Sequence, residues 1–185
     1  MLDYPDFIRH DVGLAEYGED FSQQRYFLNF LGTGFDSYLL QRMGAAGGKR
    51  WRYYLHLLSG LWFYQSPEFI LDGQRSTRSL MLMCCLGRFG GAGMKFAPQA
   101  HFDDGLFDRV NIQDMPFLQR LMSLPYLMNG KIKQHQRVQY SLHDKVFIDA
   151  REEFQFQCDG ELIAPLPVNV SIKQQALYVL KSSHK

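Results

Sequence analysis

The chain has 185 residues, of which 46% are hydrophobic and 21% charged, enough apolar material for one well-filled core or two small lobes. Its formal net charge of +1, without a basic patch, argues against nucleic acid as a partner. Three cysteines, two of them adjacent, make no disulfide framework and indicate a reducing cytoplasm. The chain has no secretory signal and no apolar stretch long enough to cross a bilayer, so we expect a cytoplasmic protein.

The first 24 residues are polar, acidic and rich in turn formers. Apolar residues alternate only around Phe7, Ile8 and Val12. This pattern is a weak beginning for a domain. We therefore expect residues 1–24 to be an entry segment that arrives from elsewhere, and residues 25–185 to form the domain itself.

A strand, a glycine turn and a helix are predicted next. Residues 25–31 have a buried-strand pattern that ends at the turn 32–36, and the pattern becomes helical over 37–46. A second helix is predicted over 49–64, because apolar and aromatic residues recur there at three- and four-residue spacing until Pro67.

After Glu68 the hydrophobic period changes towards two, which predicts an antiparallel sheet. The strands are expected at 69–71, 80–86, 106–112, 138–141, 145–148, 154–158 and 168–172. Asp-Gly or Asn-Gly pairs at 72–73, 104–105, 129–130 and 159–160 predict hairpins. One helix is expected over 115–128, bent or ended by Pro125. The predicted fold is mainly β with a few helices, an antiparallel β-sandwich or open barrel.

Two glycine-rich segments do not qualify as nucleotide-binding loops. In the segment 44–50 the leading glycine is misplaced, and Arg50 stands where a Ser or Thr should hold the metal. The segment 32–34 lacks the third glycine of a dinucleotide fingerprint and is better explained as a tight turn.

The helix 49–64 allows two interpretations. It begins with basic residues and carries both tryptophans, so it could lie at a membrane interface and pass an acyl substrate inward. Core packing is the alternative that we favour, because aromatic and Met-rich stripes usually fill space.

Two acidic turns carry the main chemical signal. The glycine cluster 90–93 leads into Asp103, Asp104 and Gly105, a pattern suited to a hydrated cation beside a phosphate. Asp159-Gly160 follows an alternating strand, as a plain hairpin requires, but Glu161 is not explained by the turn. Its carboxylate could accept the proton of a hydroxyl that attacks a γ-phosphate.

The order of these motifs resembles the C-terminal domain of the diacylglycerol kinase and sphingosine kinase superfamily, in particular its bacterial lipid kinases. The resemblance spans about residues 25–180. It rests on the segments 27–36, 90–100, 103–108 and 159–161. Ala92 interrupts what is often a pure glycine run, and Phe107 replaces a common aliphatic residue, but neither change removes a carboxylate.

The resemblance implies a two-domain kinase in which an N-terminal domain carries a Gly-Gly-Asp-Gly loop for ATP. This chain has no such loop, so the resemblance makes residues 1–24 the entry segment from a missing N-terminal nucleotide-binding domain and residues 25–185 the β-sandwich domain. The resemblance assigns Mg²⁺ to the carboxylate of Asp104 and the main-chain oxygens of His101 and Leu106. It makes Glu161 the proton acceptor, with Asp159 as the competing candidate.

The leading hypothesis is the C-terminal half of an ATP-dependent lipid kinase that phosphorylates a lipid alcohol, either diacylglycerol or a sphingoid base. It would be inactive without a nucleotide-binding domain in cis or in trans. Peripheral contact with the inner membrane face and a homodimer are compatible with it. The alternatives are a non-catalytic lipid-binding or regulatory module of the same fold, and a kinase of a soluble alcohol or nucleotide cofactor.

Overall fold

The computed structural model describes residues 6–43 and 50–180. The strands are β1 (Phe7–Tyr17), β2 (Gln23–Phe27), β3 (Phe30–Gly34), β4 (Glu68–Leu71), β5 (Gln74–Cys85), β6 (Phe107–Gln113), β7 (Val138–His143), β8 (Lys145–Ala150), β9 (Gln155–Cys158), β10 (Glu161–Pro165) and β11 (Val168–Leu180). The helices are α1 (Phe35–Met43), α2 (Arg50–Phe63) and α3 (Phe117–Met128), with short 3₁₀ turns at Gly91–Gly93 and Ile132–Gln134.

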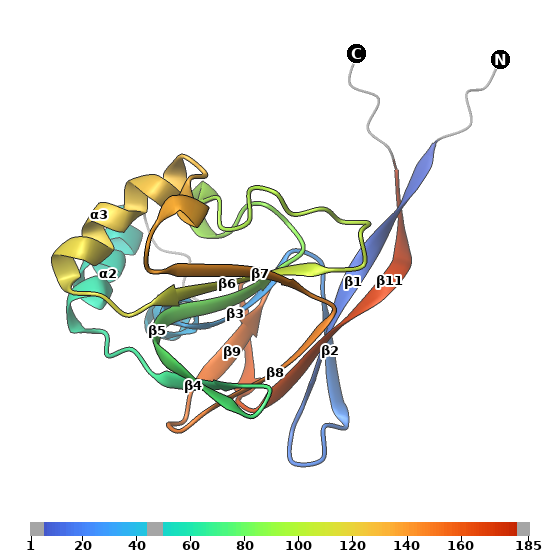
Figure 1. Cartoon of the computed structure of the whole chain (residues 1–185), viewed down its shortest axis with the longest axis horizontal. Coiled ribbons are helices and arrows are strands. Elements are labelled where there is room, and N and C mark those ends of the chain that lie inside the picture. The colour runs from blue at the N-terminus through green and yellow to red at the C-terminus, as the bar shows by residue number, and fades with distance from the viewer. Residues whose placement is uncertain (1–5, 44–49, 181–185) are drawn as a thin grey trace.

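The strands pair antiparallel in one sheet with the order β10-β9-β3-β5-β4-β8-β11-β1-β2, and β6 and β7 branch from β5. The sheet curls into a half-barrel (Figure 1). Strand β5 is the shared element of the curl, because its first half pairs with β4 and its second half lies between β3 and β6. The predicted mainly β fold of sandwich or open-barrel type is confirmed.

Alternation along β5 supplies both hydrophobic clusters of the domain. Met81, Met83 and Cys85 face the cluster that α1, α2 and α3 cover, whereas Leu82 and Cys84 face the cluster inside the curl. Successive side chains of a strand point to opposite faces, so one buried strand can serve two cores.

The cysteines belong to these cores. Cys84, Cys85 and Cys158 are buried and free, and burial raises the pKa of each thiol. A neutral buried thiol is a poor nucleophile, so these residues act as small apolar side chains. The expectation that they form no disulfide is confirmed.

Strand β1 belongs to the sheet, although the sequence analysis placed the start of the domain at residue 25. It pairs with β11 from Phe7 opposite Leu180 to Tyr17 opposite Val168. The alternation is hidden because Gly13 makes room for the ring of Phe27 and because a buried aspartate, Asp11, interrupts the apolar residues. The domain body therefore begins within the first 24 residues. A preceding nucleotide-binding domain stays a prediction.

Other elements differ from the expectations in detail. The predicted strand 25–31 is two strands, β2 and β3, that meet at a corner at residues 28–29. Helix α3 continues through Pro125 to Met128, and the pair 129–130 ends this helix instead of forming a hairpin. The pair 104–105 lies in a loop before β6. The segment 44–49, which covers most of the rejected phosphate loop and the end of the predicted helix 37–46, lies outside the described residues.

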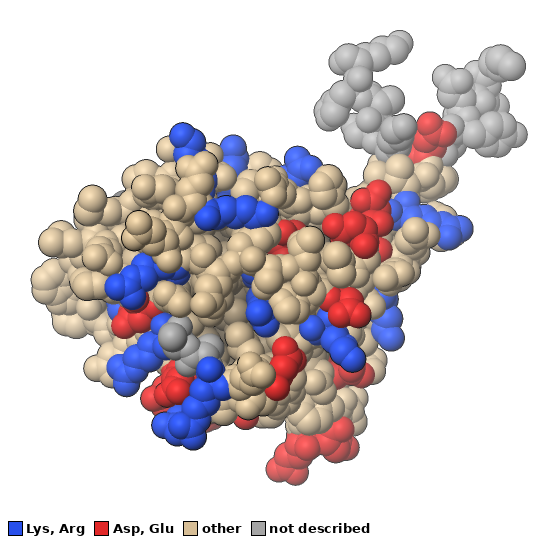
Figure 2. Space-filling view, viewed as in Figure 1, with Lys and Arg blue, Asp and Glu red and all other residues tan. Residues whose placement is uncertain are grey.

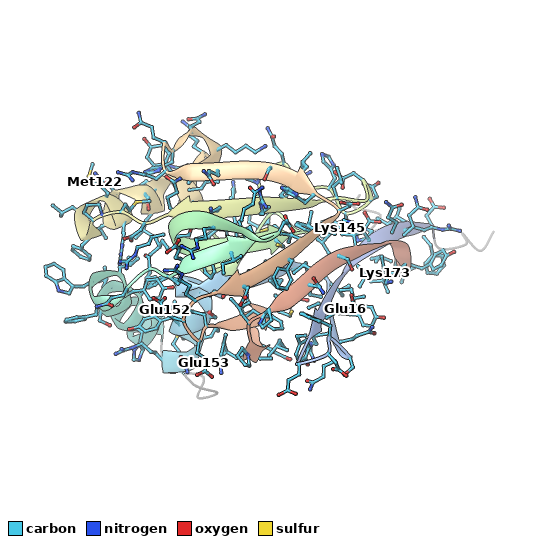
Figure 3. All side chains as sticks on the ribbon, turned by 60° about the horizontal axis from the view of Figure 1, so that its bottom comes forward. Glu16, Met122, Lys145, Glu152, Glu153 and Lys173 are labelled. Carbon is cyan, nitrogen blue, oxygen red and sulfur yellow. The ribbon has the colours of Figure 1, made fainter. Side chains whose placement is uncertain are left out.

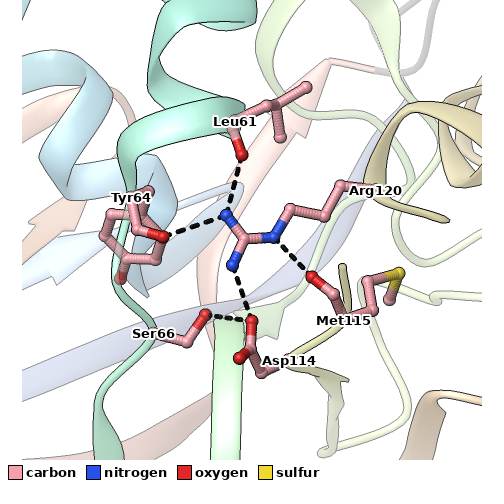
Figure 4. Close-up of polar contacts among 6 residues, drawn as sticks. All are labelled: Leu61, Tyr64, Ser66, Asp114, Met115 and Arg120. Carbon is pink, nitrogen blue, oxygen red and sulfur yellow. Dashed lines mark hydrogen bonds and ion pairs between the residues drawn. The ribbon is translucent and has the colours of Figure 1, made fainter. Parts of the chain in front are cut away.

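Helices α2 and α3 lie side by side on one end of the sheet, and the outer ends of β1 and β11 lie at the other end (Figure 1). A buried arginine, Arg120, joins the two helices. Its guanidinium donates to the main-chain oxygens of Leu61, Tyr64 and Met115 and to the carboxylate of Asp114 (Figure 4). Because a buried guanidinium must be fully paired, this network fixes α3 against the end of α2.

Candidate functional site

An open cleft of about 470 Å³ lies between β1, the corner at residues 28–29 and the long loop that follows β5. Its walls are formed by His10, Asn29, the segment 87–89 and the segment 100–103. The rings of His10 and Phe102 stack with their centroids 4.9 Å apart. The cleft therefore brings together segments that are far apart in the sequence.

Asn29 joins the corner to the loop. Its side-chain amide donates to the main-chain oxygen of Phe89 at 3.0 Å, and its own main-chain oxygen accepts the N–H groups of Leu86 and Gly87. A Cβ atom at Gly87 would overlap the side-chain oxygen of Asn29, so glycine is required for this close approach. The position of the loop wall thus depends on Asn29.

Asp159 holds the same corner from the opposite side. Its carboxylate accepts the backbone N–H groups of Leu28 at 2.7 Å and of Asn29 and Phe30 at 2.9 Å each. Asp159 occupies the turn of the β9–β10 hairpin with φ +52°, a conformation that aspartate tolerates better than most residues. Both carboxylate oxygens are thus engaged by backbone donors of the corner, which is the arrangement of a positioning group.

Glu161 begins β10 at the surface. Its carboxylate pairs with the guanidinium of Arg25 on β2, and both side chains are exposed. Glu161 is not among the residues that line the cleft. It is connected to the cleft through the hairpin, because Asp159 holds the corner that carries Asn29.

The loop that carries the predicted metal ligands is anchored by Asp11. This residue is 1% exposed, and its carboxylate accepts the N–H of Gly105 and the N–H of Gln175, both at 2.7 Å. The N–H of Asp11 donates to the main-chain oxygen of Phe102 at 2.6 Å. The buried charge is thereby satisfied by backbone donors, and the loop 102–105 is tied to β1 and β11.

The three predicted metal ligands lie close together along this loop. Asp104 and His101 are exposed, and Leu106 is half-buried. One carboxylate oxygen of Asp104 accepts the N–H of Leu106 at 3.0 Å, which shapes the turn, and within residues 6–43 and 50–180 no donor binds its second oxygen. His101 lines the cleft, whereas Asp104 and Leu106 do not.

The oxygen atoms that this loop offers are the type of ligand that Mg²⁺ binds. Mg²⁺ prefers oxygen, keeps several waters and is commonly held by one or two carboxylates together with substrate phosphates. Over residues 6–43 and 50–180, no group of three His, Cys, Asp or Glu side chains is placed to hold a metal. Any cation here would therefore depend on Asp104, main-chain oxygens, water and a phosphate.

The glycine run that precedes this loop forms a compact turn. Gly90 and Met94 pair through a backbone hydrogen bond of 2.9 Å around the 3₁₀ turn Gly91–Gly93. A Cβ atom at Gly90 would lie 2.7 Å from the ring of Phe96. Lys95 then donates its N–H to the main-chain oxygen of Leu127 on α3. The run thus connects α3 with the wall of the cleft.

Two acids near these motifs, the half-buried Asp36 and the buried Asp108, have raised pKa values. Burial raises the pKa of Asp36 to about 6, although the side-chain amide of Gln157 donates to its carboxylate. Burial also raises the pKa of Asp108, against the effect of a hydrogen bond from the hydroxyl of Tyr140. Both carboxyl groups are thus held in surroundings that favour the neutral form.

Sequence reasoning selected Asp104, His101, Leu106, Asp159 and Glu161, and the structure brings the first three into one loop and the last two into one hairpin. It missed Asp11, Asn29 and Gln157. A polar residue between apolar neighbours in a strand was the signal that could have found Asp11. The role of Asn29 depends on contacts with residues about 60 and 130 positions away, which no local pattern reveals.

The curled antiparallel sheet with helices on one side places the chain among β-sandwich-like domains. Residues 31–181 match the family described as YegS C-terminal NAD kinase beta sandwich-like domain, and the chain belongs to this family. Its members are lipid kinases of the diacylglycerol kinase type. The resemblance stated from the motifs is thereby confirmed.

Individual relatives agree with this assignment. The "Diacylglycerol kinase" of Mycobacterium tuberculosis is 27% identical over 94% of this chain, and the "Putative lipid kinase YtlR" of Bacillus subtilis is 24% identical over 91%. A solved structure of "a putative diacylglycerol kinase" from Bacillus anthracis superposes with a TM-score of 0.70 at 18% identity and covers 96% of this chain. This chain spans 58%, 59% and 57% of the lengths of these proteins, respectively.

Proposed function

We propose that this chain is the acceptor- and metal-contributing half of an ATP-dependent lipid kinase. It would transfer the γ-phosphate of ATP to the hydroxyl group of a lipid alcohol, either diacylglycerol or a sphingoid base. ATP would be bound mainly by a nucleotide-binding domain, supplied in cis or in trans. The cytoplasm, with peripheral contact at the inner membrane face, is the location that this function requires.

One observation supports the proposal above the others: the motifs 27–36, 90–100 and 103–108 each contribute a residue to one cleft, and the 159–161 turn holds the corner that carries Asn29. Asp159 binds the N–H of Asn29, Asn29 binds the main-chain oxygen of Phe89 in the loop after β5, and His101 lies across the same cleft. A plain hairpin would not need its turn carboxylate to hold a distant corner. Phosphoryl transfer needs such fixed positioning, because most of its catalysis comes from orientation and electrostatics.

Each of the candidate residues has its own role in the proposed reaction. The lipid hydroxyl attacks the γ-phosphorus, a new P–O bond forms, the bond to the ADP oxygen breaks, and the carboxylate of Glu161 takes the hydroxyl proton. Asp159 keeps the corner and the hairpin in place. Asp104, with main-chain oxygens of His101 and Leu106, would hold Mg²⁺, which neutralises phosphate charge when it is bound.

The test combines the chain with a nucleotide-binding domain from a relative, either fused to its N-terminus or added separately. Labelled ATP, Mg²⁺ and mixed micelles containing diacylglycerol or sphingosine are supplied, and the lipid phosphate is counted. We expect turnover with the lipid acceptors and none with glycerol. Glu161→Gln should lower kcat by a factor on the order of 100 or more, and Asp104→Asn should raise the Mg²⁺ concentration that is required.

Glu153→Gln is the matched control, because Glu153 is exposed on the segment between β8 and β9, where Figure 3 labels it, and does not line the cleft. It should leave turnover unchanged. Full activity of both Glu161→Gln and Asp104→Asn would refute the assignment of these residues. Phosphorylation of glycerol in preference to lipid would refute a lipid acceptor and favour the kinase of a soluble alcohol.

A non-catalytic lipid-binding or regulatory module is the second candidate. The ion pair between Glu161 and Arg25 favours it, because a paired carboxylate outside the cleft is less available as a base. This candidate predicts stoichiometric lipid binding without any phosphorylated product in the same assay. Product formation that depends on Glu161 would exclude it.

A further inference from the structure

Helix α3 carries apolar residues on its exposed side as well as on its inner side, where Leu127 is buried and Phe117 and Leu124 pack against the core. Its buried residues include Arg120 and Ser123, whereas every exposed residue except Gln119 is apolar or aromatic. The exposed apolar and aromatic residues are Leu118, Leu121, Met122, Pro125, Tyr126 and Met128. A surface helix normally turns its apolar stripe to the core and its polar residues to solvent. The outer stripe of α3 is therefore suited to a non-aqueous surrounding.

This orientation is fixed by specific bonds. All three nitrogens of the Arg120 guanidinium are paired (Figure 4). Nη1 donates to main-chain oxygens at the end of α2, and Nε and Nη2 donate to Met115 and Asp114, which follow β6. The hydroxyl of Ser123 donates to the main-chain oxygen of Arg120 at 2.7 Å. Rotating α3 to bury its apolar stripe would break these bonds and leave a buried charge unpaired, which is strongly unfavourable.

Helix α2 extends the same surface. Trp62 and Phe63 are 62% and 71% exposed, and the ring of Trp62 contacts that of Phe117 edge-on with centroids 4.6 Å apart. On α3, Leu118 and Met122 are 68% and 71% exposed, and Met122 points away from the body in Figure 3. We call Leu58, Trp62, Phe63, Leu118, Leu121 and Met122 the apolar helix face. Contiguous exposed apolar surface of this kind marks an interaction site.

The exposed charged residues between α3 and β7 are basic, whereas Asp114 just before α3 is paired with the buried Arg120. The segments 37–67 and 115–143 contain none of the 19 acidic residues of the chain but eight of its 20 Lys and Arg residues. Beyond the end of α3, Lys131, Lys133 and Arg137 are exposed. Figure 2 shows a largely uncharged surface over α2 and α3, with the red acidic side chains mainly over the rest of the molecule. The face is thus apolar and has a basic surround.

The apolar helix face is also connected to the cleft. Lys95 of the glycine run donates its N–H to the end of α3, and the aliphatic part of its side chain lies against Gly130. The same loop continues from this run to His101 and Asp103 in the cleft wall. The outer ends of β1 and β11 lie at the other end of the molecule (Figure 1).

We propose that the apolar helix face docks on a lipid bilayer that carries anionic headgroups. Trp62, Phe63, Leu118 and Met122 enter the interfacial region, and the basic residues around them contact the headgroups. Aromatic and apolar side chains with flanking Lys or Arg are typical of protein surfaces that bind at the interface between an anionic bilayer and water. This inference rests on the proposed lipid-kinase function for its purpose, since the acceptor of that reaction lies in a membrane. The binding itself requires neither ATP nor turnover.

A second copy of the chain is a less suitable occupant. Two copies of one face would bring basic surrounds together, and like charges oppose association. An anionic bilayer neutralises the same charges. Among the helices that the structure describes, none is both long and apolar enough to span a membrane, so the contact proposed here is a peripheral one.

The test is co-sedimentation of the 185-residue chain with vesicles, without nucleotide. Vesicles of phosphatidylcholine are compared with vesicles in which part of it is replaced by phosphatidylglycerol. We expect binding to the mixed vesicles that weakens with added salt. The triple variant Phe63→Ser, Leu118→Ser and Met122→Ser should bind them about tenfold or more weakly.

The matched control replaces exposed apolar residues elsewhere, with Leu142→Ser on β7 and Tyr178→Ser on β11. It should bind vesicles like the parent chain, and both variants should keep the parent circular dichroism spectrum. If the triple variant does not fold, the single variant Met122→Ser and the charge variant Lys131→Glu with Lys133→Glu take its place, and weaker binding by both is expected. Equal vesicle binding by folded helix-face variants and the parent would overturn the proposal.

Two further outcomes separate this inference from the others. If the parent chain ignores vesicles but is a dimer that the triple variant converts to a monomer, the face is a self-association surface and the proposal fails. If vesicle binding depends on the helix face and no lipid is phosphorylated in the assay above, the docking proposal stands and the kinase proposal fails. If the complemented chain phosphorylates lipid but the chain binds no vesicles, the kinase proposal stands and the docking proposal fails.

Discussion

The carboxylate of Asp159 accepts the backbone N–H of Asn29 at 2.9 Å, although 130 positions separate the two residues. The same carboxylate holds Leu28 and Phe30 on either side. Because Asn29 in turn fixes the loop at Phe89, the β9–β10 hairpin determines the shape of the cleft. This relationship assigns different tasks to the two acids of the 159–161 turn.

Asp159→Asn is expected to destabilise the fold, and Glu161→Gln is not. An asparagine keeps one acceptor oxygen and loses the charge that three amides bind, so the free energy of unfolding should fall by about 2 kcal/mol. Glu161 makes an exposed ion pair, whose loss should change that free energy by less than about 0.5 kcal/mol. Urea unfolding of both variants measures the difference. A stable Asp159→Asn beside a destabilised Glu161→Gln would reverse the roles assigned here.

Asp11→Asn is expected to loosen the loop that carries Asp104. The substitution removes the charge and one acceptor from a buried group that binds the N–H groups of Gly105 and Gln175, and should cost about 2 kcal/mol of stability. Hydrogen exchange should show faster exchange of these two amides than of the sheet amides. The exposed Asp6→Asn is the control. Unchanged protection of Gly105 would show that Asp11 does not anchor the loop.

Gly87→Ala is expected to disturb the cleft through Asn29. The added Cβ would overlap the side-chain oxygen of Asn29 and displace the amide that donates to Phe89, with a loss of about 1–3 kcal/mol. In the double variant with Asn29→Ala, that overlap is absent. The destabilisation of the double variant should therefore be about 1 kcal/mol smaller than the sum of the destabilisations of the two single variants. A double-mutant cycle of unfolding free energies measures this difference. Strict additivity would exclude the contact as the cause.

Periodicity predicted most of the sheet because its strands bury one or both faces. The strands expected over 69–71, 145–148 and 168–172 lie within β4, β8 and β11, and the strand expected over 106–112 lies within β6 except for its first residue. β1 was missed because Gly13 and Asp11 replace apolar residues at buried positions, each for a contact made elsewhere in the fold. A local pattern cannot show that Phe27 needs the space above Gly13.

For the candidate site, the sequence predicted only the types of residue and their order along the chain. Acidic turns and glycines could be read directly, so the loop 101–106 and the hairpin 159–161 were found. Their connection through Asn29, the anchoring by Asp11 and the division between Asp159 and Glu161 depend on pairs of residues remote in sequence. The helix expected over 115–128 was found as α3, which continues through Pro125 to Met128, so of the two effects expected of Pro125 the ending of the helix is wrong.

Asp36→Asn is expected to remove a pH dependence of stability. Burial raises the pKa of Asp36 to about 6 in the folded protein, above the ordinary value of 3.8. The folded state therefore binds this proton more tightly than the unfolded state does. The contribution of this proton to the free energy of unfolding is fully present below about pH 4 and is lost as the pH rises through 6. This change is on the order of 3 kcal/mol.

An asparagine at position 36 stays neutral at every pH and can still accept the hydrogen bond from Gln157. The variant should therefore match the parent chain near pH 4 and be more stable than it at pH 8, as measured by urea unfolding at both pH values. The difference between variant and parent isolates Asp36, since Asp108 contributes a slope of the same sign to both. Glu153→Gln at the surface should leave the parent slope unchanged. If Asp36→Asn keeps the full slope between pH 4 and 8, the carboxyl of Asp36 is not the group that titrates.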